Sequence, residues 1–212
     1  LDQPGATGNV RLRELQHAYD SANRLVRRTE LLFDPATQAM IQPGTSVTQY
    51  RYDGASRLIS TTDPRGLQTR FQYDSAHRRV GVTDAGGNEV RIAYDPNSNI
   101  VRLDRIDQST SGAEDRFETT LYAYDPLNRV TRIVDGAGNV RDYGYDSRGY
   151  LAYVSDGRRA SPNAPGNVRR MSYDGLGRLV ETVQELTADG TGAGAVTGAI
   201  RLRKEYDASS RL

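Results

Sequence analysis

Apolar and polar residues alternate along the chain with a period of two, most clearly just before a recurring Tyr-Asp pair. In Thr69–Tyr73, the residues Thr, Phe and Tyr alternate with Arg and Gln. Two residues before the recurring tyrosine, six of eight positions are apolar or aromatic, whereas all eight positions directly before it are small or polar. This period predicts β-strands with one buried face. We see no sustained 3.6-residue stripe, so we expect at least half of the chain to be strand, with almost no helix.

The Tyr-Asp pair occurs eight times, and its spacing defines a repeat. Successive tyrosines are 33, 21, 21, 30, 21, 28 and 33 residues apart, which indicates a 21-residue unit with insertions. A period of this size is typical of repeat architectures. We therefore predict one array over residues 1–212. Its structural motif consists of Tyr19, Asp20, Tyr52, Asp53, Tyr73, Asp74, Tyr94, Asp95, Tyr124, Asp125, Tyr145, Asp146, Tyr173, Asp174, Tyr206 and Asp207.

Each Tyr-Asp pair leads into a sequence that favours a tight turn. With the Asp as first position, the second is often Pro or Gly and the fourth is Asn, Ser, His or Gly, as type I turns prefer. The Asp carboxylate can cap backbone N–H groups of its own turn. Similar turns are expected in mid-repeat at residues 63–66, 84–87 and 135–138. Each unit then holds two turns and two strands of about six residues, with the motif tyrosine buried.

The amino-acid composition favours a single sheet that is exposed to solvent. Hydrophobic residues make up 36% of the chain even with Tyr counted, and there is no Trp. This is low for a globular domain and favours a single sheet wetted on one face over a thick two-layer core. The net charge of +1 gives no global attraction for nucleic acid or anionic lipid. The absence of Cys excludes disulfides and thiolate metal sites.

Other features of the chain bear on its organisation. Every basic residue except Lys204 is arginine, a bias that we attribute to GC-rich coding. The chain begins at Leu1 with no signal-like apolar run, and no stretch is long enough to span a membrane. It stops within a motif, so we expect a fragment of a longer protein. The longest insertions, which we interpret as loops, are 104–117, 156–167 and 187–198.

The motifs resemble the RHS/YD-repeat family, whose pattern is YDxxGRL followed by DxxGN and the next YD. The match is clearest at YDGASRLISTTDPRGLQTRFQYD and YDPLNRVTRIVDGAGNVRDYGYD, and it covers the chain from Tyr19 onwards. The resemblance implies an all-β fold of repeated antiparallel β-hairpins in a coiling sheet, a segment of an RHS/YD-repeat shell. In bacterial Rhs polymorphic toxins and the Tc toxin C component such shells enclose a toxic C-terminal domain, and in teneurins a related shell belongs to an adhesion protein.

One further family motif has a local match. Bacterial shells usually end in a segment beginning DPxGL, which carries self-cleavage carboxylates. Asp63–Leu67 has these letters, but it lies in mid-repeat and continues into the next Tyr-Asp unit. We therefore interpret it as an ordinary turn.

Candidate chemistry is sparse. Paired carboxylates could act as acid and base, but the distinctive Asp residues occupy turn positions. His17 and His77 are the only histidines, and both are interpreted as structural. The Asp-Gly turns lack the ligand pattern of calcium loops. Exposed Tyr and Arg could bind sugars, although a cross-strand ladder of tyrosines explains them better. We predict no enzyme, no catalytic, cofactor-binding or metal-binding residue and no cofactor.

Two functions follow from the resemblance. The first is the structural wall of a hollow β-shell that encloses a toxic C-terminal cargo in a large secreted bacterial protein. The alternative is an extracellular carbohydrate-binding or adhesion module of a cell-surface YD-repeat protein. The implied partners are further repeats of the same shell and an enclosed toxin domain, with carbohydrate possible, and without nucleic acid or membrane insertion. We also expect uncapped sheet edges that pair with neighbouring strands.

Overall fold

The described part of the chain is an all-β protein. A computed structural model describes residues 10–108, 116–155, 167–187, 195–207 and 209, and within these it contains 15 strands and no helix. Strands account for more than half of the described residues, which confirms the expected fold class. Accordingly, the described residues include no helix able to cross a membrane.

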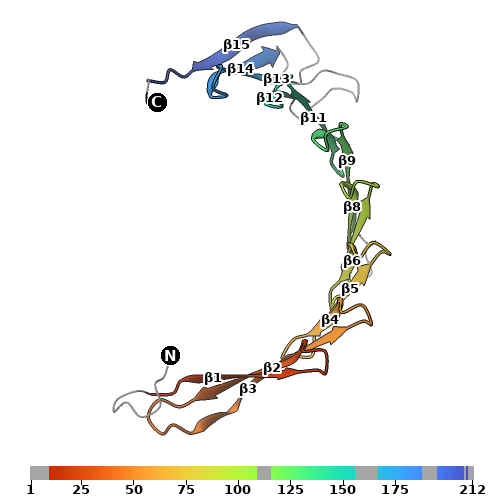
Figure 1. Cartoon of the computed structure of the whole chain (residues 1–212), viewed down its shortest axis with the longest axis vertical. Helices are drawn as coiled ribbons and strands as arrows, with labels where there is room; N and C mark the ends of the chain where they lie inside the picture. Colours follow the sequence, from red (N-terminus) through yellow and green to blue (C-terminus); the bar gives the residue numbers. More distant parts are fainter. Residues whose placement is uncertain (1–9, 109–115, 156–166, 188–194, 208, 210–212) are drawn as a thin grey trace. The chain divides into compact units, whose positions relative to one another are not determined.

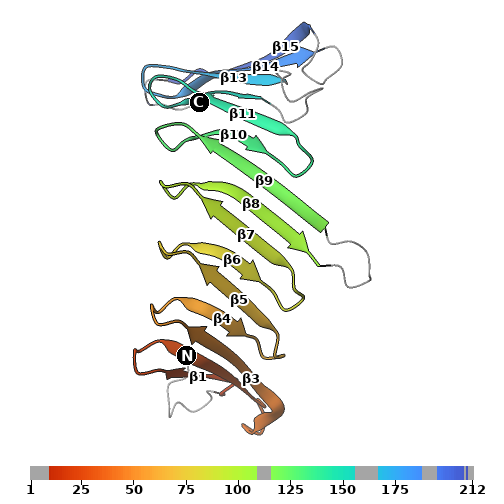
Figure 2. The same ribbon diagram turned by 90° about the vertical axis from the view of Figure 1, so that its right-hand side faces the viewer.

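From β1 to β7 and from β9 to β15, each strand pairs antiparallel with the next one in the sequence (Figure 2). The chain divides into two compact units. The first comprises residues 1–91 with 107–114, and the second comprises residues 92–106 with 115–212. The division falls within β7, between Arg91 and Ile92.

The first unit is built from β-hairpins joined in series (Figure 1). Its strands are β1 (Arg13–Tyr19), β2 (Leu25–Phe33), β3 (Met40–Tyr52), β4 (Leu58–Thr62), β5 (Gln68–Tyr73), β6 (Arg79–Thr83) and the first half of β7 (Glu89–Tyr94). Where two strands join through a Tyr-Asp turn, the register shifts at the tyrosine, as between Gln72 and Tyr73 in the pair of β5 with β6. The shift is a β-bulge, which follows from the left-handed fourth residue of these turns.

The second unit continues the same construction. Its strands are β8 (Ile100–Asp107), β9 (Arg116–Tyr124), β10 (Val130–Val134), β11 (Val140–Tyr145), β12 (Leu151–Ser155), β13 (Val168–Tyr173), β14 (Leu179–Thr187) and β15 (Val196–Arg203). The register again shifts beside the motif tyrosines of β11 and β13. The expectation that 104–117, 156–167 and 187–198 are loops is wrong at their ends, because 104–107 belong to β8, 116–117 to β9, 187 to β14 and 196–198 to β15. Residues 109–115, 156–166 and 188–194 lie outside the described residues.

Cross-strand pairs define the two faces of each unit, because directly opposed residues point to the same side. Phe71 opposes Val82, which opposes Val90, and these residues share what we call the tyrosine face with the motif tyrosine two positions after Phe71. Arg51 opposes Ser60, which opposes Arg70, and these residues lie on the other side, which we call the charged face. The period-two alternation is therefore confirmed.

The expectation that the motif tyrosines are buried is wrong in degree. The described tyrosines of the motif are half-buried, and Tyr19 is 55% exposed. The described residues that are buried lie elsewhere, on the charged face: Thr29, Ser60, Asp104, Val140 and Ser155. The physical reason is that no second layer packs on the described sheet, so a residue is covered only where long side chains of adjacent strands lie over it. Ser60, for example, lies between Arg51 and Arg70.

Candidate functional site: a repeated tyrosine, aspartate and arginine ladder

The motif aspartate closes each turn through its side chain. In the Asp53 turn, Oδ1 accepts hydrogen bonds from the backbone N–H groups of Ala55 and Arg57, both at 2.9 Å. The backbone N–H of Ser56 donates to the Asp53 carbonyl at 3.0 Å, and Ser56 has a left-handed φ of 62°. The same carboxylate caps recur at Asp20, Asp74, Asp125, Asp146 and Asp174. At Asp95 the N–H of Asn99 donates, and at Asp207 that of Ser209.

The residue four positions after the aspartate links one repeat to the next. Arg57 donates from Nε to Asp53 Oδ2 at 2.7 Å, and from Nη1 to the backbone carbonyl of Asp74 at 3.0 Å. Its guanidinium carbon also lies 5.1 Å from the ring centroid of Tyr73, within the range of a cation–π interaction. One arginine therefore binds its own turn, the next turn and the next tyrosine.

Similar arginine contacts occur in both units. Arg24, Arg57, Arg78, Arg129 and Arg178 all donate from Nε to the aspartate of their own turn, at 2.7–2.8 Å. Arg24, Arg129 and Arg178 also lie over the tyrosine of the next repeat, at 5.0, 4.2 and 4.7 Å from the ring centroids. Because the guanidinium group is planar and has several donors, it can make these contacts at once.

The motif tyrosine completes the link with its hydroxyl group. The Tyr73 hydroxyl donates to the backbone carbonyl of Leu58 at 2.9 Å. Leu58 is the fifth residue after the preceding motif aspartate. The equivalent bonds run from Tyr52 to Leu25, Tyr124 to Ile100, Tyr145 to Val130, Tyr173 to Leu151 and Tyr206 to Leu179, at 2.8–3.0 Å. Tyr94 is half-buried at the end of β7. Tyr19 precedes the first described turn of the series, which accounts for its exposure. Each of the six tyrosine hydroxyl bonds therefore connects a motif tyrosine to the turn before it.

Two repeats depart from the arginine pattern, and the structure compensates in each. Asn99 replaces arginine and donates to Asp95 Oδ2 at 2.9 Å and to Asn128 Oδ1 at 2.7 Å. Tyr150 replaces arginine in the Asp146 hairpin and stacks on Tyr173 with ring centroids 4.9 Å apart. There Arg148 reaches the Asp174 carbonyl at 2.7 Å in its place. The link between repeats is thus kept by different side chains.

The mid-repeat turns have the expected form. Asp63, Asp84 and Asp135 accept backbone N–H bonds on Oδ1, and the fourth positions are glycines with φ of 83°, 87° and 80°. Within the DPRGL segment, Gly66 donates to the Asp63 carbonyl at 2.9 Å and Leu67 donates to its side chain at 2.8 Å. This segment is therefore a turn of the repeat.

These hydrogen bonds favour the ionised form of the turn aspartates. The backbone N–H of the arginine four positions later is the main cause that lowers the pKa of Asp20, Asp53, Asp74 and Asp174. A side-chain hydrogen bond from Arg129 or Asn139 is the main cause that lowers the pKa of Asp125 or Asp135. Since their carboxylates are engaged as acceptors at neutral pH, these residues serve as structural caps.

The role of the motif arginines was missed by sequence reasoning. Attributing the arginine bias to GC-rich coding treats it as a property of the whole composition, which hides the position at which arginine recurs. The available signal is that six of the eight copies have arginine four residues after the motif aspartate. A recurrent residue at a fixed place in a repeat indicates a contact between repeats.

Both histidines are accounted for by their places in the fold. His17 lies on β1 next to the Tyr19 ring, with centroids 6.4 Å apart in an edge-on arrangement. His77 occupies the left-handed fourth position of a turn, with φ of 63°. Within the described ranges, no group of three or more His, Asp or Glu side chains is placed to hold a metal ion.

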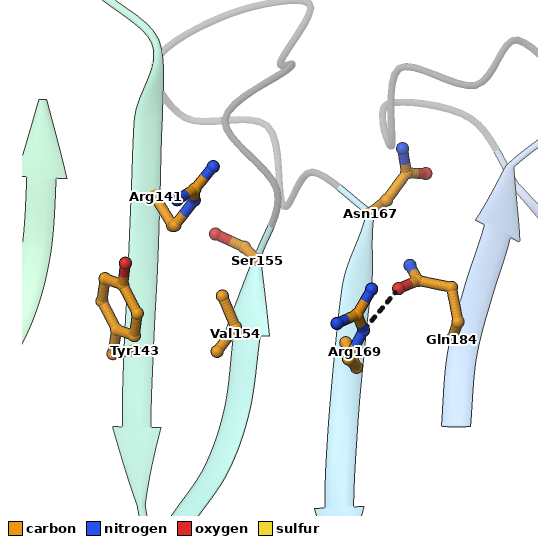
Figure 3. A pocket seen from close by; sticks show the side chains of 7 residues that line it. All are labelled: Arg141, Tyr143, Val154, Ser155, Asn167, Arg169 and Gln184. Atoms are coloured by element: carbon orange, nitrogen blue, oxygen red, sulfur yellow. Dashed lines mark hydrogen bonds between the residues drawn. The ribbon is translucent and has the colours of Figure 1, made fainter. Parts of the chain in front are cut away.

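A separate hollow lies mainly on the tyrosine face of the second unit, where Ser155 of the charged face also borders it. It has a volume of about 360 Å³ and is lined by Arg141, Tyr143, Val154, Ser155, Asn167, Arg169 and Gln184 (Figure 3). Arg169 donates from Nε to Gln184 Oε1 at 3.2 Å. Sequence analysis did not predict this hollow, because the repeat pattern places residues on faces and does not show where the surface of a face is hollowed.

Comparisons with known proteins agree with this geometry. A family model described as RHS Repeat matches residues 37–67, 52–89 and 124–160. No curated protein sequence matches. The crystal structure of TcdB2-TccC3-TEV is similar with a TM-score of 0.57 and 19% identity, over 84% of this chain and 9% of that one. The Photorhabdus luminescens Tc holotoxin pore with a TccC3 mutation covers 95% of this chain and 13% of its own, at 12% identity and a TM-score of 0.47. The chain thus spans a small part of these proteins, and the first likeness shows a shared fold.

Proposed function

This chain belongs to the RHS repeat family, and from that premise we propose that it is a wall segment of a hollow β-shell that encloses a toxic C-terminal cargo. The parent would be a large secreted bacterial protein, in which further repeats continue the wall. We propose the eight motifs as one continuous array within that wall. The partners of this segment are then the remaining repeats and the enclosed domain.

The observation that carries the proposal is the repeat-to-repeat ladder. Arg24, Arg57 and Arg148 donate to the backbone of the following turn, and Arg129 and Arg178 lie over the following tyrosine. Each linked tyrosine binds the preceding turn, so neighbouring hairpins are joined by side chains as well as by strand pairing. Such a ladder can be extended by adding repeats, because every hairpin presents the same acceptors and the same ring to the next one. This is the property required of a wall built from one repeated unit.

The adhesion alternative receives less support from the same contacts. It depends on tyrosine and arginine side chains that are available to a sugar. The motif residues are already engaged, as Tyr73 is with Leu58 and Arg57 with Asp53, Tyr73 and Asp74. We further propose that the segment has no catalytic role, since its turn aspartates serve as caps.

Protease protection of the cargo in the full-length parent protein tests the proposal. Limited proteolysis should leave the C-terminal domain intact in the native protein and cleave it once the protein is unfolded. Combining Arg57→Ala with Arg129→Ala removes two links between repeats and should make the cargo accessible at lower protease concentration. Arg201→Thr is the matched control, because Arg201 lies outside the ladder on β15. A C-terminal domain cleaved equally fast in the native parent and in all variants would contradict a wall role.

A further inference from the structure

One position on the tyrosine face departs from the pattern of the repeats. Four residues before the motif tyrosine, six of the eight copies have Leu, Thr or Val: Leu15, Thr48, Thr69, Val90, Thr120 and Leu202. The two exceptions are Arg141 and Arg169, in successive repeats of the second unit. Because small or aliphatic residues serve the repeat elsewhere, the fold does not require a cation here.

These two arginines line the same hollow. Arg169 opposes Val154, and Val154 opposes Tyr143, so these three side chains form one row across β11, β12 and β13. Arg141 lies two residues before Tyr143 on the same face, beyond the row. Figure 3 shows Arg141 and Arg169 on different strands around the hollow, with the Val154 strand between them.

The charges on the two faces of this unit are arranged differently. On the charged face the acidic groups pair with arginines: Arg132 with Asp142 at 2.7 Å, Arg170 with Glu185 at 3.0 Å and Arg203 with Glu181 at 3.0 Å. Among the residues that the structure describes, neither Arg141 nor Arg169 forms an ion pair, and Arg169 donates to the neutral Gln184. The pKa of Asp135 is lowered mainly by a hydrogen bond from Asn139 and also by the charge of Arg141, but the Asp135 and Arg141 side chains do not pair directly. The hollow therefore offers two cations to a negatively charged group.

A second, more apolar hollow adjoins the first. Its volume is about 520 Å³, and it shares Arg169 and Gln184 with the first hollow. Its remaining lining includes Met171, Leu179, Ile200 and Leu202. Ile200 is 61% exposed and Leu202 is 58% exposed, so aliphatic surface lies next to the two arginines.

We propose that the two adjoining hollows bind an extended polypeptide segment that carries a carboxylate side chain and, beside it, an aliphatic side chain. The arginines match a carboxylate, since guanidinium–carboxylate hydrogen bonds are among the strong ones. The second hollow favours a polypeptide over an acidic sugar. Its Met, Ile and Leu side chains match a branched hydrocarbon side chain, and the described residues that line it include no aromatic ring on which a sugar could pack. This inference does not depend on the wall role, because the hollows lie within the second unit.

A short synthetic peptide tests the site on the 212-residue chain. In acetyl-Gly-Ser-Glu-Thr-Leu-Ser-Gly-amide, Glu and Leu are two positions apart and project to the same side of an extended backbone. Titration followed by NMR should shift signals of Tyr143 and Ile200 together. Replacing Glu by Gln, or Leu by Ser, in the peptide should each weaken binding by roughly tenfold, the value of one hydrogen bond to a charged group or one buried aliphatic side chain.

Variants of the protein provide the second arm. Arg141→Thr with Arg169→Thr introduces a residue that other repeats use at this position, so the fold should be kept, and binding should fall by at least tenfold. Arg201→Thr is the matched control on the charged face, where Glu181 keeps its pairing with Arg203, and it should leave binding unchanged.

Three results would overturn the proposal. One is the absence of any peptide-dependent shift at millimolar concentration. Another is binding that persists unchanged in the double arginine variant or with the Gln peptide. The third is glucuronate binding as tightly as the peptide while the Leu-to-Ser change has no effect, which would identify an acidic sugar site instead.

Discussion

At the scale of single residues, the tyrosine, aspartate and arginine of the motif have different roles in forming a turn and in linking it to its neighbours. The aspartate caps its own backbone, the arginine connects that carboxylate to the following turn, and the tyrosine hydroxyl reaches back to the preceding one. Stability at this scale comes from hydrogen bonds at the rim of the sheet, because the described residues include few that are fully buried.

Substitution of Tyr73 should measure the backward link. Tyr73→Phe removes the bond to the Leu58 carbonyl and should lower the free energy of unfolding by about 1 kcal/mol. Tyr73→Ala also removes the half-buried ring and should lower it by about 2 to 3 kcal/mol. Tyr19→Ala is the control, because this ring is 55% exposed and its loss should change the value by less than about 1 kcal/mol. Urea titration gives all three values, and equal losses at Tyr73 and Tyr19 would contradict the ladder.

The aspartate caps predict a loss of stability in acid. The pKa of Asp20, Asp53, Asp74 and Asp174 is lowered in the folded chain, first by backbone N–H donation from the arginine four residues later. A lowered folded pKa means that the stabilisation is fully present above the unfolded value of about 3.9. It is then lost as the pH falls through the folded values. The urea midpoint should therefore stay constant from neutral pH to about pH 5 and fall steeply below about pH 4. Asp53→Asn with Asp74→Asn should flatten this acid limb.

At the scale of the hairpin, the turns were the most predictable elements. Asp at the first position and Gly, Asn, Ser or His at the fourth specify the geometry locally. All the observed left-handed residues except Gln38 stand where that pattern puts them. The sequence did not predict which face of the sheet has the more buried side chains. Alternation tells which residues share a face, but coverage in a single layer depends on how far the side chains of adjacent strands extend. Ser60 is buried because the two residues that oppose it are arginines, Arg51 and Arg70.

Opposite substitutions at two turns should separate backbone strain from side-chain contacts. His77 has φ of 63°, which costs an L-residue energy that glycine does not incur. His77→Gly should therefore raise the free energy of unfolding by about 0.5 to 1 kcal/mol, after the greater unfolded-chain freedom of glycine is subtracted. Gly66 has φ of 83°, and an added Cβ would meet no atom within 4 Å. Gly66→Ala should then lower the value by about 1 kcal/mol through strain alone. A stabilising Gly66→Ala would show that this turn is not left-handed.

At the scale of the whole molecule, the described strands leave their outer hydrogen-bonding groups available at β15. All eight residues of β15 are exposed, and the described strand that pairs with it is β14. Its exposed side chains include Val196, Ile200 and Leu202. A long edge strand with exposed apolar residues is a template for pairing with another chain. The same groups that would receive the next hairpin in a longer wall can receive a second copy of this chain.

Sedimentation velocity should detect this pairing as association of the 212-residue chain that depends on concentration. The weight-average sedimentation coefficient is expected to rise with concentration, because each added chain covers one open edge. Val196→Lys with Leu202→Lys places charges on β15, as natural edge strands do, and should shift the distribution towards monomer. Arg201→Lys is the matched control, since it alters the same strand while keeping its charge, and it should leave the association unchanged. A sharp monomer boundary at all concentrations in the unmodified chain would mean that the edge is already covered. The chain would then be a self-contained domain, which would contradict the proposal of a wall segment because a wall needs an edge that receives further repeats.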